Sequence, residues 1–365
     1  MTSFCASGSS MPPISLPDVE LTLDCASKDA LHILRQIKPE WCDESSADEV
    51  LVKNFDDGIT NKVFGFHLKS DPSPISHKDM VLFRVFGEKT EKVITRQNEI
   101  LTLNMLHQVG LGPELYSVFK NGLAYEYLKG VPLDAKSCRD PNIMRLTADT
   151  FAQWHCRVHP SESDFDFSIP MPILKTRQWL EQLSDHEGIL LASISDKRFT
   201  IDSLKKELAE IEVWSRIDEP LVFSHNDTLL ANLVYNEKEN SVKLIDYEYG
   251  GPSYRAFDVG NHFDEMCGIG DVIDFSIFPS PEEQKQFITF YLDSFNALKS
   301  LPPPTADEVE EFYRNVGKMC LLSHFYWGVW SLLQSTISKI DFDYVQYSRD
   351  KLTEYYTRKE AFLNL

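Results

Sequence analysis

The stretch HNDTLLAN at residues 225–232 and the run LIDYE at residues 244–248 decide what kind of fold this chain can have. The first carries Asp227 and, five residues on, Asn232; the second places Asp246 at the end of an apolar, β-prone run. A loop carboxylate can orient and deprotonate an acceptor hydroxyl, while an amide oxygen and a second carboxylate can hold metal ions against phosphates. The three residues together predict phosphoryl transfer, which needs positioning and charge neutralisation more than covalent chemistry.

Each piece of this pattern has a plainer explanation when it is taken alone. Asn and Asp in a turn commonly satisfy local backbone groups, and Asp246 by itself would fit the end of a strand. Aspartate, asparagine and then aspartate after a short hairpin is, however, the order that protein kinases use. We therefore assign Asp227, Asn232 and Asp246 to catalysis, with Asn232 and Asp246 as metal ligands.

Composition narrows the classes of partner and compartment. The chain has 365 residues, 42% of them hydrophobic, enough for one two-lobed domain or two tightly packed ones. Its formal net charge of -20 excludes nucleic acid and anionic lipid as expected partners and suits a small cationic substrate, although acidity more often serves solubility alone. Seven scattered cysteines without a CxxC pair, and no basic and apolar leader, predict a soluble cytoplasmic protein. The most apolar stretch, from about Cys320 to Leu333, is interrupted by His324 and is too short for stable membrane insertion.

Hydrophobic periodicity predicts a β-rich first third and a mainly helical remainder. In the first third we expect strands at 49–55, 62–68, 80–86, 115–119 and 123–127, and helices at 30–37 and 95–109. The remainder is expected to be helical at 141–155, 173–183, 200–216 and from 281 onward, with short strands at 222–224, 233–235 and 242–245. These elements predict an α+β fold, with a small mixed lobe at 26–127 and a larger helical lobe at 128–365. Residues 1–25, whose first twenty are rich in Ser and Pro, are expected to be disordered.

The amino-terminal lobe is expected to bind the nucleotide. Between two predicted strands lies DDGITN, where backbone N–H groups around Gly58 and Asn61 and the hydroxyl of Thr60 can reach phosphates. A single glycine there fits a plain hairpin turn equally well. At the joint near residue 127, Glu126 and Leu128 would offer backbone groups to adenine.

A charge pair is predicted in the same lobe. Arg84 stands inside the apolar run 81–86, and an unpaired buried charge costs several kcal/mol. Glu99, on the following helix, is its natural partner. The pair is similar to the Lys–Glu pair that holds nucleotide phosphates in kinases, with arginine in place of lysine. A purely structural strand–helix ion pair is the alternative.

Longer motifs resemble one family closely. The segment IDYEYGGPSYRAFDVGNHFDE, residues 245–265, is similar to the signature of the choline/ethanolamine kinase family. The HND…N loop resembles the one that this family shares with aminoglycoside kinases, and FDDGITNK at 55–62 resembles the ethanolamine kinase form of the nucleotide loop. Further matches lie at 110–116, 236–238 and 323–347. The resemblance implies a protein-kinase-like fold, with ATP and Mg²⁺ as cofactors.

The resemblance also implies roles for residues around the catalytic pattern. It makes Asp227 the base and Asn232 and Asp246 the metal ligands. Glu248 is either a third carboxylate near magnesium or a hydrogen-bonding residue. Three other residues of the segment, Asp258, Asn261 and His262, are expected to tie the catalytic loop down by buried hydrogen bonds.

A substrate ammonium is implied by a second set of residues. In the family, the position of Glu265 looks like one that faces this cation. Trp327 and Trp330 lie three apart on one helix face, a pattern that by itself more often marks packed core. The resemblance instead implies cation–π contacts from these two rings. We add Tyr249, Tyr344 and Tyr347 as substrate-binding candidates, and Phe342 fits plain core.

The amino alcohol is expected to be ethanolamine. Choline carries three methyl groups and prefers an aromatic box, whereas ethanolamine offers three N–H donors and prefers acceptors. The residues after Glu265, MCGIGD at 266–271, and DFSIFP at 274–279, resemble ethanolamine kinases; Gly251 and Pro252 depart from the family pattern. The expected product is phosphoethanolamine, in the first step of the CDP-ethanolamine route to phosphatidylethanolamine. Alternatives are a choline or dual-specificity kinase, an aminoglycoside-type kinase and an inactive binding module, and the sequence leaves a homodimer open.

Overall fold

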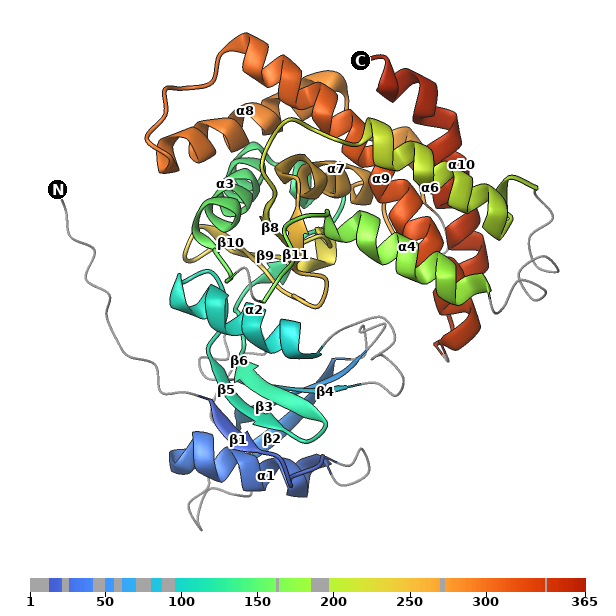
Figure 1. Ribbon diagram of the computed structural model, residues 1–365. Helices are drawn as coiled ribbons and strands as arrows, with labels where there is room; N and C mark the ends of the chain where they lie inside the picture. Colours follow the sequence, from blue (N-terminus) through green and yellow to red (C-terminus); the bar gives the residue numbers. More distant parts are fainter. Residues whose placement is uncertain are drawn as a thin grey trace. The chain divides into compact units, whose positions relative to one another are not determined.

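The computed structural model describes residues 13–21, 26–41, 50–55, 61–69, 80–86, 96–161, 164–184, 197–269, 273–338 and 340–365 (Figure 1). The chain divides into two compact units. One consists of Met1–Val93 and Pro113–Lys129, and the other of Ile94–Gly112 and Gly130–Leu365. Among the described residues, no helix has both the length and the apolar character needed to cross a membrane.

The first unit is built on a six-stranded sheet with the order β1-β5-β6-β4-β3-β2. All neighbouring strands are antiparallel except β1 and β5, which run parallel. The bounds are β1 Ile14–Leu16, β2 Val50–Phe55, β3 Asn61–Leu68, β4 Val81–Phe86, β5 Leu115–Phe119 and β6 Gly122–Glu126. A helix α1, Ala26–Ile37, and a 3-10 turn η1, Pro39–Trp41, complete the unit.

Strand β1 corrects the expectation that residues 1–25 are disordered, at least for 13–21. Ile14 accepts a hydrogen bond from the hydroxyl of Ser117 at 2.9 Å. The side chain of Asn121 bonds both backbone groups of Leu21, at 2.9 and 3.0 Å, and the Leu21 side chain is 2% exposed. Composition gave no sign of this, because the partners of β1 lie about one hundred residues away in the chain.

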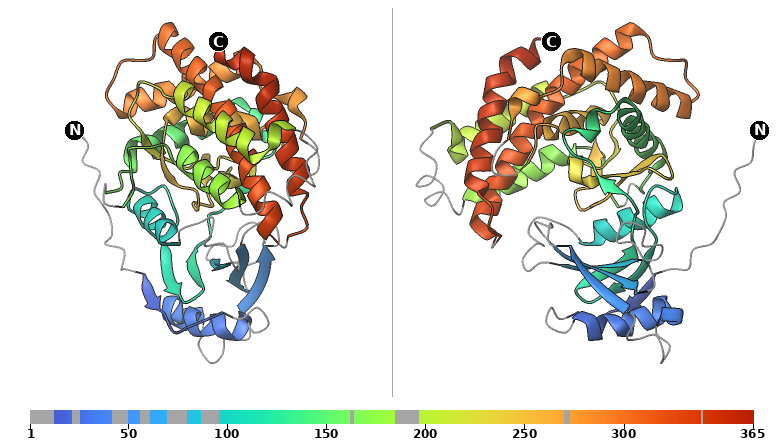
Figure 2. Two further views of the ribbon diagram at one scale, coloured as in Figure 1. Left: turned by 45° about the vertical axis from the view of Figure 1, so that its right-hand side comes forward. Right: turned by 180° about the vertical axis from the view of Figure 1, so that it is seen from behind.

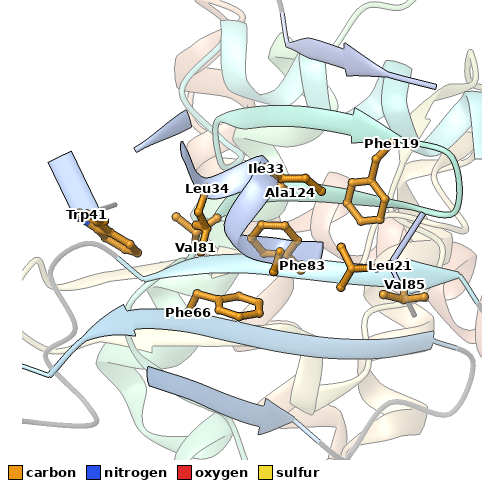
Figure 3. Packing of buried hydrophobic residues seen from close by; sticks show 11 residues of the cluster. Leu21, Ile33, Leu34, Trp41, Phe66, Val81, Phe83, Val85, Phe119 and Ala124 are labelled. Atoms are coloured by element: carbon orange, nitrogen blue, oxygen red, sulfur yellow. The ribbon is translucent and has the colours of Figure 1, made fainter. Parts of the chain in front are cut away.

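The core of the first unit lies between α1 and the sheet, as Figure 3 shows. Alternation along β4 directs Val81, Phe83 and Val85 to one face. There Phe83 meets the ring of Phe66 edge to face, with centroids 4.8 Å apart. Burying each such side chain contributes about 1.5–3 kcal/mol. The remaining members are Leu21, Ala30, Ile33, Leu34, Trp41, Phe119 and Ala124.

The second unit is mainly helical. Its helices are α2 Arg96–Gln108, α3 Pro141–Arg157, α4 Met171–Leu183, α6 Ile201–Trp214, α7 Arg255–Glu265, α8 Pro281–Leu298, α9 Ala306–Ile337 and α10 Tyr344–Leu363. Two small sheets accompany them: β7 Val131–Pro132 with β9 Leu233–Asn236 and β10 Ser241–Leu244, and β8 Val222–Ser224 with β11 Gly251–Ser253. Short 3-10 turns lie at η4 Ser137–Arg139, η6 Lys197–Phe199, η7 Leu230–Asn232 and η8 Phe275–Ile277.

Helix ends in this unit follow from the sequence. Ser280 with Glu283 and Thr305 with Glu308 form capping boxes at the starts of α8 and α9. The 32-residue helix α9 packs against α4, α7 and α10 (Figure 2). At Gly260 on α7, an added Cβ would lie 2.8 Å from the backbone nitrogen of Cys320 on α9, so the two helices touch through their backbones.

Most predicted elements of the α+β fold are found within two or three residues of their expected ends. Helix α7 is an exception, since its polar residues Asp258, Asn261 and His262 hid the helical pattern. Residues 94–112 belong to the larger unit, whereas the predicted boundary places them in the smaller lobe. The carbonyl of Val109, just after α2, accepts a hydrogen bond from Arg157 of α3 at 2.7 Å, which ties α2 to the larger unit.

Candidate active site

A short hairpin brings the two halves of the catalytic pattern together. Strands β9 and β10 pair antiparallel with Leu233 opposite Leu244. The residue before β9 therefore lies beside the residues after β10, and the backbone of Ile245 donates to the carbonyl of Asn232 at 2.9 Å. This register brings Asp246 close to Asn232.

Asp227 and Asn232 are in direct contact. The side-chain amide of Asn232 donates to Oδ2 of Asp227 at 2.9 Å and to its backbone carbonyl at 3.1 Å. The nitrogen of the amide therefore faces Asp227, and its oxygen, the atom that can ligate a metal ion, faces elsewhere.

Two residues of the site have left-handed backbone conformations, Asn226 and Asp246, each with φ of 64°. Asn and Asp enter this region more readily than other non-glycine residues, and strain of this kind costs about 1–3 kcal/mol. The side chain of Asn226 stabilises its turn by donating to the carbonyls of Tyr249 and Gly251 at 3.0 and 3.1 Å. Asn226, just after β8, is thus hydrogen-bonded to Gly251 of β11, and few residue types other than Asn, Asp and Gly would adopt its backbone conformation.

Asp258, in the first turn of α7, fixes the backbone of the catalytic loop by hydrogen bonds. Its two oxygens accept the backbone N–H groups of His225 and Asn226, both at 2.8 Å. A third contact comes from Nε2 of His155, at 3.0 Å, whose Nδ1 lies 2.9 Å from the hydroxyl of Tyr291. The predicted supporting role of Asp258 is confirmed. His155 was not predicted, because a histidine near the end of α3 carries no distinguishing pattern.

The other two predicted supports, Asn261 and His262, bind the backbone of Thr228, the residue after Asp227. Oδ1 of Asn261 accepts the N–H of Thr228 at 2.8 Å, and its amide donates to Ser323 of α9 at 3.0 Å. His262 also hydrogen-bonds the backbone of Thr228, and burial lowers the pKa of this histidine to about 4. The catalytic loop is therefore fixed on both sides of Asp227.

Replacing Asp258 by asparagine tests this support. The Asp258→Asn variant keeps the shape but exchanges one acceptor oxygen for a donor that faces a backbone N–H. We expect a loss of about 1.5–3 kcal/mol in the free energy of unfolding, the usual contribution of hydrogen bonds to a charged group. Urea unfolding measures this loss, and an unchanged midpoint would contradict the role. Asp140→Asn is a matched control, because Asp140 also accepts two backbone N–H groups but at a helix N-cap, where asparagine serves equally.

Negative charge is concentrated around Asp227. Burial, and then the charges of Asp246, Glu265 and Glu248, raise the pKa of Asp227 well above its usual range, while the hydrogen bond from Asn232 lowers it. Within the described ranges, no group of three or more His, Cys, Asp or Glu side chains is arranged to hold a metal ion by itself. Mg²⁺ is ordinarily held by one or two carboxylates together with phosphates and water, so such a site does not need a protein cage.

Four aromatic residues, Tyr249, Trp327, Trp330 and Tyr344, form a cluster that we call the aromatic cluster. The indole of Trp330 donates to the hydroxyl of Tyr249 at 2.8 Å. Ring centroids are 5.3 Å apart for Tyr249 and Trp327, 5.4 Å for the two tryptophans and 5.9 Å for Trp330 and Tyr344. Burial raises the pKa of Tyr249 well above its usual range, and the charges of nearby carboxylates raise it further. The cluster therefore lies next to the catalytic carboxylates.

Glu265 already has a protein cation beside it. Lys351 of α10 places Nζ 2.7 Å from Oε1 of Glu265, and Oε2 is buried without a hydrogen-bond partner in the described structure. Tyr347 lies beside Lys351 and also contacts Phe342, whose ring centroid is 5.6 Å away. Sequence reasoning missed Lys351, although a lysine on the buried face of a helix is a recognisable signal.

The predicted nucleotide residues are less fully described. Gly58 and Thr60 lie outside the described residues, and only the backbone of Asn61, at the start of β3, is described. Arg84 and Glu99 are buried, at 5% and 3% exposure, in different units, and their pairing stays a prediction. Glu126 ends β6, where it accepts the N–H of Glu114 at 3.2 Å, and Leu128 follows shortly after it.

A family model described as choline/ethanolamine kinase matches residues 52–356. The chain belongs to this family. Ethanolamine kinase 2 of Mus musculus is 37% identical over 333 residues, which cover 90% of this chain and 80% of that protein. The structure of an ethanolamine kinase from Plasmodium vivax matches with a TM-score of 0.75 at 25% identity, over 93% of this chain and 90% of that one.

Family membership confirms the fold expected from the sequence. An ADP-bound aminoglycoside phosphotransferase shares the fold with a TM-score of 0.56 at 14% identity, over 90% of this chain and 97% of that one. The protein-kinase-like fold is thus confirmed, while at this identity the likeness concerns the fold alone. Choline/ethanolamine kinases are ATP-dependent phosphotransferases with an alcohol acceptor, so the expected enzyme class is confirmed as well.

Proposed function

We propose that this protein transfers the γ-phosphate of ATP to the hydroxyl of ethanolamine, giving phosphoethanolamine and ADP. The single observation that carries the chemistry is Asp227, fixed by Asn232 and lying among Asp246, Glu248 and Glu265. The substrate follows from relatives named ethanolamine kinase that match across most of the chain. The product would enter phosphatidylethanolamine synthesis.

Asp227 is the proposed base. Its Oδ2 receives the amide of Asn232, so Oδ1 is the oxygen that orients the acceptor hydroxyl and takes up its proton. A carboxylate whose pKa is raised toward the working pH suits this task. The supports from Asp258 and Asn261 hold the backbone of this loop still while the proton moves.

Mg²⁺ fits the charges of the site. Burial and then the neighbouring carboxylates raise the pKa of Asp227, and a divalent cation that binds among these carboxylates offsets their negative charge. Asn232 and Asp246 would hold the ion, with Glu248 as a third ligand or a hydrogen-bonding neighbour. When bound, the ion neutralises the phosphate oxygens of ATP. The nucleotide itself is assigned to Gly58, Thr60, Asn61, Arg84, Glu99, Glu126 and Leu128.

The ammonium of the substrate is assigned to Glu265 and to the rings of the aromatic cluster and Tyr347. A cation over such a ring gains about 0.5–2 kcal/mol. Rings alone would suit choline as well, since its methyl groups offer no N–H donors. The unpartnered Oε2 of Glu265 is an acceptor, and this favours the primary ammonium of ethanolamine.

A substrate comparison tests the proposal. We expect kcat/KM for ethanolamine to exceed that for choline by more than tenfold, or about 1.4 kcal/mol. Formation of ADP is followed by a coupled assay, and phosphorus NMR identifies the product. A preference for choline would make the protein a choline kinase instead, and turnover of aminoglycosides alone would point to that class. No turnover of any alcohol would indicate a binding module.

A cytoplasmic site of action is part of the proposal. The described cysteines Cys138, Cys156, Cys267 and Cys320 are free thiols, as is usual in a reducing compartment. Nucleic acid is not proposed as a partner, given the net charge of -20. A homodimer stays a hypothesis, which light scattering of the purified protein would decide.

A further inference from the structure

Lys351 is a fully buried lysine of the second unit. Its side chain on α10 is 0% exposed, and burying an ammonium group costs several kcal/mol unless a carboxylate and further hydrogen bonds compensate. Glu265, 3% exposed at the end of α7, supplies that carboxylate at 2.7 Å. The Nζ atom also lies 5.5 Å from the centre of the Tyr347 ring.

The pair is asymmetric. Lys351 engages only Oε1 of Glu265, while Oε2 is buried and receives no hydrogen bond in the described structure. Leaving a buried carboxylate oxygen without a donor is costly, so a missing donor needs an explanation. The charge of Glu265 also helps to raise the pKa of Asp227, so this carboxylate belongs to the group of negative charges around the proposed base. A hydrogen-bond donor on a substrate that binds near Asp227 could supply the bond that Oε2 of Glu265 lacks.

We propose that Lys351 is a positioning residue for the amine substrate, holding the Glu265 carboxylate by Oε1 so that Oε2 is turned to receive an N–H of the substrate ammonium. This rests on the proposed function. Without the lysine, the Glu265 carboxylate, at 3% exposure, would lose its charged partner and would turn toward other donors, because a buried carboxylate without a partner is costly. That change removes the acceptor that the ammonium needs.

The same arrangement predicts selectivity among amines. Ethanolamine brings three N–H donors and choline brings none. Oε2 can therefore form a charge-assisted hydrogen bond only with the less methylated amines. Lys351, by keeping Oε2 available, favours ethanolamine over choline, whereas the aromatic rings attract both.

The alternative is that Lys351 only joins α10 to α7. In that case its loss would weaken the fold and would change the KM of ATP and of the amine alike. A positioning role predicts a separation: a higher KM for ethanolamine, an unchanged KM for ATP and a smaller effect on choline. Kinetics with both amines therefore distinguish the two roles.

The test begins with Lys351→Met in the full-length chain. We expect the KM for ethanolamine to rise by about tenfold or more, the usual effect of losing one hydrogen bond to a charged group. Lys351→Arg keeps the cation and should restore the wild-type KM. Lys351→Gln keeps a hydrogen-bond donor beside Oε1 but removes the charge. If Lys351→Met does not fold, Lys351→Gln takes its place in this comparison.

Lys359→Met is the matched control. Lys359 lies on the same helix and pairs with Glu207 and Glu210 at 2.5 and 2.8 Å, neither of which is assigned to the site. Its loss should leave both KM values unchanged. Circular dichroism and thermal melting establish that each variant is folded.

A double variant shows whether Lys351 acts through Glu265. Combining Glu265→Gln with Lys351→Met should give the same ethanolamine KM as Glu265→Gln alone, because contacting residues that act as one are not additive. Additive increases, equal changes in the KM of ATP and amine, or an unchanged amine KM in folded Lys351→Met would each overturn the inference. Wild-type protein that neither binds nor phosphorylates ethanolamine would overturn the proposed function, and this inference with it.

Discussion

Asp227→Asn is expected to lower kcat by about 10²–10⁴-fold, the range contributed by general acid–base catalysis. The substitution is nearly isosteric, and its amide oxygen can still accept the hydrogen bond that Asn232 now gives at 2.9 Å. The loop should therefore keep its shape and lose only the ability to take up the proton of the hydroxyl. Single-turnover kinetics with saturating ATP and ethanolamine measure this step.

The binding of ATP separates this explanation from general damage. Calorimetric titration should give an unchanged Kd for ATP with Mg²⁺, because Asp227 is assigned to the acceptor rather than to the nucleotide. Asp293→Asn, at an exposed position of α8, makes the same chemical change away from the site and should leave kcat unaltered. Turnover at the wild-type rate in Asp227→Asn would refute the assignment of the base.

Asp246→Asn is expected to reduce kcat on the order of 10³-fold, since a catalytic metal ion stabilises several kcal/mol of charge. Asparagine rather than alanine is the informative change, because residue 246 has a φ of 64° that Asn and Asp accept with least strain. The loss should therefore report on metal binding and not on the backbone. Titration with Mg²⁺ should show half-saturation at a higher concentration than in the wild type.

Asn240→Asp is the matched control for this variant. Asn240 also has a left-handed conformation, with φ of 47°, and lies in the turn of the same hairpin. Asn240→Asp makes the reverse exchange of the same two residue types outside the site, so activity and Mg²⁺ dependence should be unchanged. Chelation with EDTA should abolish wild-type activity, and added Mg²⁺ should restore it. Full activity of Asp246→Asn at ordinary magnesium would remove Asp246 from the metal site.

The sequence could predict that Asp227, Asn232 and Asp246 come together, because these residues are close along the chain. Asp227, Asn232 and Asp246 stand within one loop and one hairpin, so their spacing fixes their relation through strand register. The supports Asp258 and Asn261 were also found, but through resemblance and not through periodicity. Helix α7 itself was missed, since residues that bond a neighbouring loop interrupt the apolar pattern that marks a helix.

Contacts between residues far apart in the chain could not be predicted from the sequence. Glu265 was predicted to face a substrate cation, yet the ammonium group at 2.7 Å belongs to Lys351, 86 residues later. His155 meets Asp258 across 103 residues, and β1 pairs with a strand about one hundred residues further along. Local pattern carries no information on such pairings, because they arise from packing between helices and from strand order in the completed sheet.

The backbone contact at Gly260 has a consequence for how the substrate preference of this enzyme can change. Asn261 beside it anchors the loop of Asp227, and α9 carries Trp327 on the other side of the contact. At Gly260 the two backbones are already in contact, so the helices cannot come closer, and any side chain added there would collide with the backbone of α9. A larger or smaller head group must therefore be accommodated by exchanging side chains, among them Tyr347 and Lys351 of α10, and not by a change in the distance between α7 and α9 at this point.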